Sequence, residues 1–189
     1  MARKQKSEVA HNRSVAPGDS EYQVGGSTML ILGDVTFRIS AQGADSRNLG
    51  RWSYITLTGK NSVTTTIFTC YCPCRSTSIG SVFAQQLLYI SMNKQTLPKI
   101  DCPRQLFGYD LKNEIENKQD QGHNILMLGD VNSCYADLTT WMQELGLHEF
   151  IERRGSHTNS KKRKPVYSDR LYFWHSPLFY LTKRLFILF

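Results

Sequence analysis

The sequence predicts a layered α/β domain, because segments typical of strands alternate along the chain with segments typical of helices. Residues 63–71 are rich in β-branched side chains and end before Pro73, as expected of a strand. Residues 124–128 form a near-continuous apolar run, which is typical of a strand buried on both faces. Between these strands, apolar residues recur at helical spacing at 78–93 and after Pro103. We expect two helices there that cover one face of a sheet.

Two shorter segments precede these elements. Residues 28–32 are apolar, and residues 35–39 alternate between apolar and polar side chains. The pair Gly33-Asp34 lies between them and is suited to a tight turn. The pattern therefore predicts a β-hairpin.

The remaining elements follow in chain order. A polar loop at 43–50 leads into residues 52–58, which predict a strand. Apolar residues at 138–145 repeat at helical spacing, and Gly146 is placed to end that helix. Residues 171–174 predict a last strand.

The chain divides into three parts. Residues 1–23 are polar without apolar periodicity and are expected to be a disordered lead-in. Residues 24–178 carry the predicted elements, and residues 179–189 form an apolar tail of unclear structure. No segment reaches the ~18 consecutive apolar residues that a membrane span needs, and the basic start lacks the apolar core of a signal peptide. We therefore expect an intracellular protein without a membrane partner.

The net charge favours a polyanionic partner. Lysine and arginine total 23 against 16 aspartate and glutamate residues, which gives +7, and binding to phosphates releases counterions. Much of the excess is local, in the first dozen residues and in the run Lys161, Lys162, Arg163 and Lys164. That run could contact phosphates, direct the protein to the nucleus, or form a solvated loop.

Residues near the middle of the chain offer further candidate contacts. Arg51 and Lys60 could line a nucleic-acid groove together with Trp52. Trp52 could equally lie in the core.

The cysteines point to free thiols. There are five, an odd number, and Cys70, Cys72 and Cys74 alternate near the end of one predicted strand. Zinc sites usually pair their ligands as C-x₂₋₄-C with a second pair further along, and no such second pair is present. Free thiols in a reducing compartment are the better interpretation.

The segment with most chemical content is Gly129-Asp130-Val131-Asn132, directly after the buried apolar run. The carboxyl ends of strands are where α/β enzymes gather reacting groups, and alternate positions let Asp130 and Asn132 project toward one site. An ordinary strand-to-helix turn is the alternative, because Asp and Asn are common in turns and helix caps.

This segment resembles the Gly-Asp-Phe-Asn motif of the endonuclease/exonuclease/phosphatase (DNase I-like) superfamily, with Val131 in place of Phe. Residues 67–73 resemble that family's strand ending in Tyr-x-Pro, and residues 25–32 resemble its glycine-rich entry to a central hairpin. Residues 165–173 are similar to its late strand that carries an Asp. Residues 48–53, followed by Gly59-Lys60 and by Tyr71-Cys72-Pro73-Cys74, are similar to a subgroup associated with retroelements.

The resemblance implies a partial DNase I-like sandwich of two β-sheets with flanking helices, and metal-dependent phosphodiester hydrolysis on nucleic acid. Asp130 would orient or deprotonate the attacking water, with metal binding as a further option, and Asn132 would hold the scissile phosphate. Tyr71 would approach that phosphate, and Asp169 would support a catalytic histidine. The implied cofactor is Mg²⁺ or Mn²⁺. The implied partners are DNA or RNA, and the remainder of a larger polyprotein.

The chain departs from the family pattern at both ends. Family members begin with a strand that carries an Asn, followed by a Glu that binds metal, and they end with Ser-Asp-His. Neither pattern has a match. The histidine that follows Asp169 is His175, in His175-Ser176-Pro177, and no Asp precedes it as the pattern requires. We therefore expect weak or no hydrolysis. A non-catalytic remnant or nucleic-acid-binding module is the main alternative, and hydrolysis of small phosphoesters shares the same fold.

Overall fold

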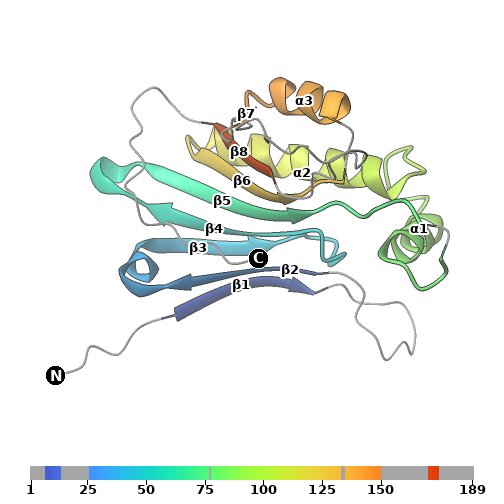
Figure 1. Cartoon of the computed structure of the whole chain (residues 1–189), viewed down its shortest axis with the longest axis horizontal. Coiled ribbons are helices and arrows are strands. Elements are labelled where there is room, and N and C mark those ends of the chain that lie inside the picture. The colour runs from blue at the N-terminus through green and yellow to red at the C-terminus, as the bar shows by residue number, and fades with distance from the viewer. Residues whose placement is uncertain (1–6, 14–25, 77, 133–134, 150–169, 175–189) are drawn as a thin grey trace, which may run out of the picture.

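The computed structural model describes residues 7–13, 26–76, 78–132, 135–149 and 170–174. These residues form two β-sheets and three α-helices (Figure 1). The larger sheet has six strands in the order β3-β4-β5-β6-β8-β7. Its strands are β3 (Ile39–Ala44), β4 (Trp52–Thr58), β5 (Thr64–Tyr71), β6 (Asn124–Asp130), β7 (His148–Glu149) and β8 (Arg170–Trp174).

The central pair of this sheet is parallel, and its other pairs are antiparallel. Strands β5 and β6 run side by side with Tyr71 opposite Asp130 at their ends. The chain between them contains the helices α1 (Val82–Met92) and α2 (Pro103–Asp120), because a parallel connection needs a long crossover.

A second sheet of two antiparallel strands, β1 (Ser7–Arg13) and β2 (Gly26–Leu32), packs on one face of the larger sheet. Alternate residues of β2 are buried, so Met29 and Ile31 face the larger sheet. They pack against Ile55, Ile67 and Leu128 from its central strands. This arrangement is a sandwich of two sheets.

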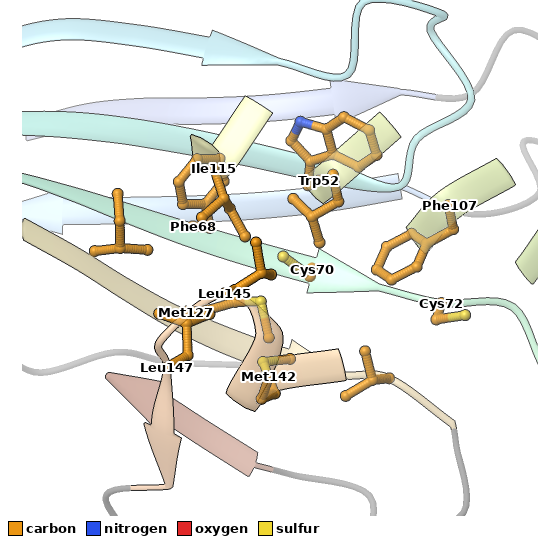
Figure 2. Packing of buried hydrophobic residues seen from close by; sticks show 13 residues of the cluster. Trp52, Phe68, Cys70, Cys72, Phe107, Ile115, Met127, Met142, Leu145 and Leu147 are labelled. Atoms are coloured by element: carbon orange, nitrogen blue, oxygen red, sulfur yellow. The ribbon is translucent and has the colours of Figure 1, made fainter. Parts of the chain in front are cut away.

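Helices cover the opposite face. Figure 2 shows the cluster in which Phe68 and Met127 of the sheet meet Phe107 and Ile115 of α2, together with Met142 of α3 (Tyr135–Glu144). Each fully buried side chain of this kind stabilises the fold by about 1.5–3 kcal/mol. The prediction that two helices cover one face holds for α2. Helix α1 lies at the edge of the sheet and packs on α2 (Figure 1).

Two sequence predictions differ from the structure. Residues 28–39 do not form a hairpin, because a 3₁₀ helix, η1 (Gly33–Arg38), separates β2 from β3. The strands β2 and β3 pair with different partners in different sheets. The expected disorder at 1–23 is wrong for β1, which pairs with β2 along seven residues; the partner strand supplies the hydrogen bonds that this polar segment needs.

Within the described residues, no helix is long and apolar enough to cross a membrane.

Candidate phosphate site

The candidate site lies at the carboxyl edge of β5 and β6. Parallel strands end at the same edge of a sheet, so Tyr71 and Asp130 are neighbours across the ladder. Strand β3 also ends at this edge, and β4 begins there, with Trp52 opposite Cys70. These four strands therefore begin or end at the same edge of the sheet, which we call the rim.

Hydrogen bonds hold Asp130 and Asn132 in a fixed relation. The backbone N–H of Asn132 donates to Oδ1 of Asp130 at 3.0 Å, and its side-chain Nδ2 donates to the carbonyl oxygen of Cys72 at 2.8 Å. The N–H of Cys72 donates to the Asp130 carbonyl at 2.9 Å. Asn132 has a φ of +44°, a left-handed conformation that asparagine adopts more readily than most residues. The two polar side chains of the motif therefore lie on one rigid turn.

The glycine of the motif is required by close packing. Gly129 has a φ of +145°, and a Cβ atom built there would lie 2.0 Å from the carbonyl oxygen of Cys70. Any other residue would push β5 and β6 apart at the point where they present Tyr71 and Asp130. The Gly-Asp-x-Asn pattern thus has a structural reason in this chain.

Tyr71 has a raised pKa at this rim. Burial is the main cause that raises its pKa above 10.0, and electrostatic interactions with Cys74, Asp130 and Cys72 raise it further. A hydrogen bond with the backbone of Cys74 opposes these effects. The phenol therefore stays protonated at neutral pH and can donate to an anionic oxygen.

Two of the thiols near the site, those of Cys70 and Cys72, are buried. Cys70, Cys72, Cys74 and Cys102 are free cysteines. Burial raises the pKa of Cys72 to about 12, and the nearby charge of Arg104 only partly opposes this. Burial also raises the pKa of Cys70. Both remain neutral thiols at physiological pH, so they serve as core residues.

Two of the basic residues predicted to contact nucleic acid, Arg51 and Lys60, are described, and neither presents its charge at this rim. The Arg51 side chain is fully buried and bonded by Asp45 and Asp110, so the prediction that it lines a groove is wrong. Lys60 is in the turn η2 (Lys60–Ser62) between β4 and β5, at the opposite end of the sheet from Tyr71, about 23 Å along the strand.

Two further parts of the predicted site, Asp169 and the run Lys161, Lys162, Arg163 and Lys164, lie outside the described residues. The strand after Asp169, β8, begins at Arg170 opposite Gly129.

The described residues do not fit the metal site that the resemblance implies. A hard cation such as Mg²⁺ needs several oxygen ligands. In the part of the chain that the structure describes, no group of three or more His, Cys, Asp or Glu side chains is placed to hold a metal ion. Asp130 by itself does not form a cage.

Asp45 and Asp110, which connect to this rim through Arg51, were not predicted from the sequence as part of the site. Asp45 and Asp110 bind the buried Arg51, and Asp45 lies in the segment predicted only as a polar loop. The sequence does show an arginine, Arg51, directly before a tryptophan at the start of a predicted strand. Its partner on α2, Asp110, is 59 residues away, so the sequence does not indicate their pairing.

Comparison with known proteins supports the fold. No family model and no curated protein matches the chain. Among solved structures, the catalytic domain of human Nocturnin with a bound sulfate anion matches with a TM-score of 0.50 at 14% identity. The match covers 89% of this chain and 60% of that domain, so the chain spans about three fifths of its length. This chain has a partial DNase I-like fold.

Proposed function

We propose that this chain acts on the phosphodiesters of nucleic acid at the rim formed by β5 and β6, as an endonuclease-type hydrolase. The Mg²⁺ or Mn²⁺ of such a reaction would need ligands beyond the described residues, since these bring together no group of three metal-ligating side chains. The observation that carries the proposal is the meeting of Tyr71, Asp130 and Asn132 on the ends of two adjacent parallel strands. The fold is of the nuclease and phosphodiesterase type. The Nocturnin domain contains a sulfate, a tetrahedral anion similar in shape to phosphate.

Each residue has a distinct role in this proposal. The protonated Tyr71 hydroxyl donates to a phosphate oxygen. The amide of Asn132 carries two hydrogens, of which the Cys72 carbonyl takes one, and the other is directed to the phosphate. The Asp130 carboxylate orients the attacking water and accepts its proton.

The charge of the chain favours nucleic acid over small phosphoesters. The net charge of +7 attracts a polyanion, which carries negative charge along its whole length, unlike a small phosphoester. The basic run Lys161–Lys164 contributes to that attraction. Membership of the retroelement-type subgroup is part of the same proposal and rests on residues 48–53 and the turn after β4.

The test is cleavage of end-labelled DNA and RNA oligonucleotides by the full chain with Mg²⁺, with Mn²⁺ and with EDTA. We expect at most weak cleavage by the wild-type chain, which falls about a hundredfold further in Asp130→Asn, since a positioned general base contributes rate of that order. Lys60→Gln is the control, because it removes one charge at the far end of the sheet. Equal cleavage by wild type and Asp130→Asn would contradict the proposal.

A non-catalytic nucleic-acid-binding module is the second candidate. It is favoured by the finding that the described part of the chain brings together no group of three metal-ligating side chains. Its signature is oligonucleotide binding that EDTA does not change, weakened by Tyr71→Phe and Asn132→Gly, without cleavage under any metal condition.

A further inference from the structure

A network of four charged residues lies directly beneath the candidate rim. Its centre is Arg51, whose side chain has no exposed surface. Nε and Nη2 of Arg51 bond the two carboxylate oxygens of Asp45 at 2.6 and 2.7 Å, a bidentate pair. The same Nη2 bonds Oδ2 of Asp110 on α2 at 2.8 Å.

The outer half of the network joins the helix to the loop. Arg47 bonds both oxygens of Asp110, with Nε to Oδ2 at 2.7 Å and Nη2 to Oδ1 at 3.0 Å. Asp45 also accepts the backbone N–H groups of Arg47 and Leu49 at 3.0 and 3.2 Å. Two positive and two negative side chains balance in charge, and Nη1 of Arg51 is buried without a hydrogen-bond partner among the described residues.

The network reaches the site through the backbone of Arg51. The carbonyl oxygen of Arg51 accepts the N–H of Tyr71 at 2.7 Å, at the point where β5 ends. The Arg51 guanidinium also lies 4.6 Å from the ring centre of Trp52, the first residue of β4. The Arg51 carbonyl is therefore one of the contacts that hold the backbone of Tyr71 beside Asp130.

Stability alone does not explain such a network. Buried ion pairs can often be replaced by apolar residues without loss, whereas removal of one partner is strongly destabilising. What the pairs do supply is a fixed geometry, because a bidentate arginine–carboxylate pair specifies direction as well as distance. Here that geometry ties the β3–β4 loop, helix α2 and the end of β5 together.

We propose that the network of Asp45, Arg47, Arg51 and Asp110 positions Tyr71 for recognition of a nucleic-acid phosphate. Arg51 is thus a positioning residue that acts through the Tyr71 backbone and does not touch the substrate. The part concerning phosphate recognition rests on the proposed function. The part concerning the position of Tyr71 stands on the hydrogen bonds alone.

The test compares Asp110→Asn with Glu116→Gln in the full chain. Both changes neutralise a carboxylate on α2, but Glu116 pairs with Lys112 at the surface, at 3.9 Å. NMR of the chain with isotope-labelled tyrosine measures the exchange rate of the Tyr71 amide and the chemical shift of its ring. The Tyr71→Phe variant identifies which resonances belong to Tyr71. Asp110→Asn is expected to speed exchange of the Tyr71 amide and move its ring resonance, and Glu116→Gln is not.

Binding supplies the functional readout. Affinity for a single-stranded oligonucleotide is expected to fall by about tenfold in Asp110→Asn, as small displacements of site residues do. In a Tyr71→Phe background the same change is expected to cost much less, because the network acts through Tyr71. A purely structural role would give equal losses in both backgrounds, and that result would overturn the proposal.

Two further outcomes are informative. If the wild-type chain binds no oligonucleotide, the proposed function fails, and the Tyr71 resonances still decide the positioning claim. If Asp110→Asn does not fold, Arg47→Gln removes only the outer, partly exposed pair. An unchanged Tyr71 amide and ring in a folded Arg47→Gln or Asp110→Asn chain would refute the positioning of Tyr71 by the network.

Discussion

The side-chain Nδ2 of Asn132 donates to the carbonyl oxygen of Cys72 at 2.8 Å, which fastens the chain after β6 to the chain after β5. The ladder between the two strands ends at Tyr71 and Asp130. This side-chain bond therefore extends the connection one step past the ladder, at the rim where phosphate is proposed to bind. Asn132 therefore has a structural role in addition to its proposed role in binding phosphate.

The first prediction separates the two costs of replacing Asn132. Asn132→Gly removes the hydrogen bond but keeps the left-handed backbone, so we expect about 1 kcal/mol of lost stability. Asn132→Ala loses the same bond and adds about 1–2 kcal/mol because alanine disfavours a positive φ. Urea unfolding of both variants measures the difference. Equal losses would show that the backbone at this turn relaxes.

Gly129 supports the second prediction. A Cβ atom there would meet the carbonyl oxygen of Cys70 at 2.0 Å, so Gly129→Ala must separate β5 from β6. We expect a loss of about 4 kcal/mol or more, the range in which backbone strain and broken packing combine. Gly80→Ala is the control, because nothing lies within 4 Å of its Cβ position. Similar melting temperatures for the two variants would refute this account.

The sequence predicted the centre of the fold because that part is encoded locally. The β-branched residues of β5 and the apolar run of β6 mark buried strands, and the helical spacing between them marks a crossover. The adjacency of Tyr71 and Asp130 then follows from parallel pairing. In the described part of the chain, the two predicted residues closest in sequence, Asp130 and Asn132, also lie close in space.

The parts that failed depend on distant partners. The pattern at 28–39 has the local features of a hairpin. In the structure, however, β2 pairs with β1 and β3 pairs with β4, so β2 and β3 do not pair with each other. Arg51 looked like a surface cation because the sequence does not show that Asp45, six residues before it, and Asp110, on α2, enclose it in a buried site.

The third prediction concerns the phenol at the site. The negative charge of Asp130 contributes to the raised pKa of Tyr71, and burial contributes more. Asp130→Asn is therefore expected to lower the pKa of Tyr71 while leaving it above the ordinary value of 10.0. The measurement is an NMR titration of the labelled tyrosine ring carbon. Lys60→Gln should leave the titration unchanged. If Asp130→Asn also left the pKa of Tyr71 unchanged, that result would argue against the proximity of Tyr71 and Asp130.

The last prediction lies away from the site, at His123. Its Nδ1 lies 2.9 Å from Oγ1 of Thr66, which also contacts Oγ1 of Thr56 at 3.0 Å. Burial, and then the charge of Lys118, lower the pKa of His123 below 6.5. When the pH falls below 6.5, the unfolded chain binds a proton that the folded chain resists, so the free energy of unfolding falls. Above pH 6.5 both states are neutral at this residue, and its contribution is constant.

His123→Gln tests this sign, because glutamine can still hydrogen-bond the Thr66 hydroxyl but does not titrate. Urea unfolding at a series of pH values below neutrality should show a weaker loss of stability on acidification in the variant than in the wild type. The carboxylates contribute equally to both chains, so the difference between the two curves isolates His123. Parallel curves would mean that the imidazole takes up its proton as easily in the folded chain as in the unfolded one.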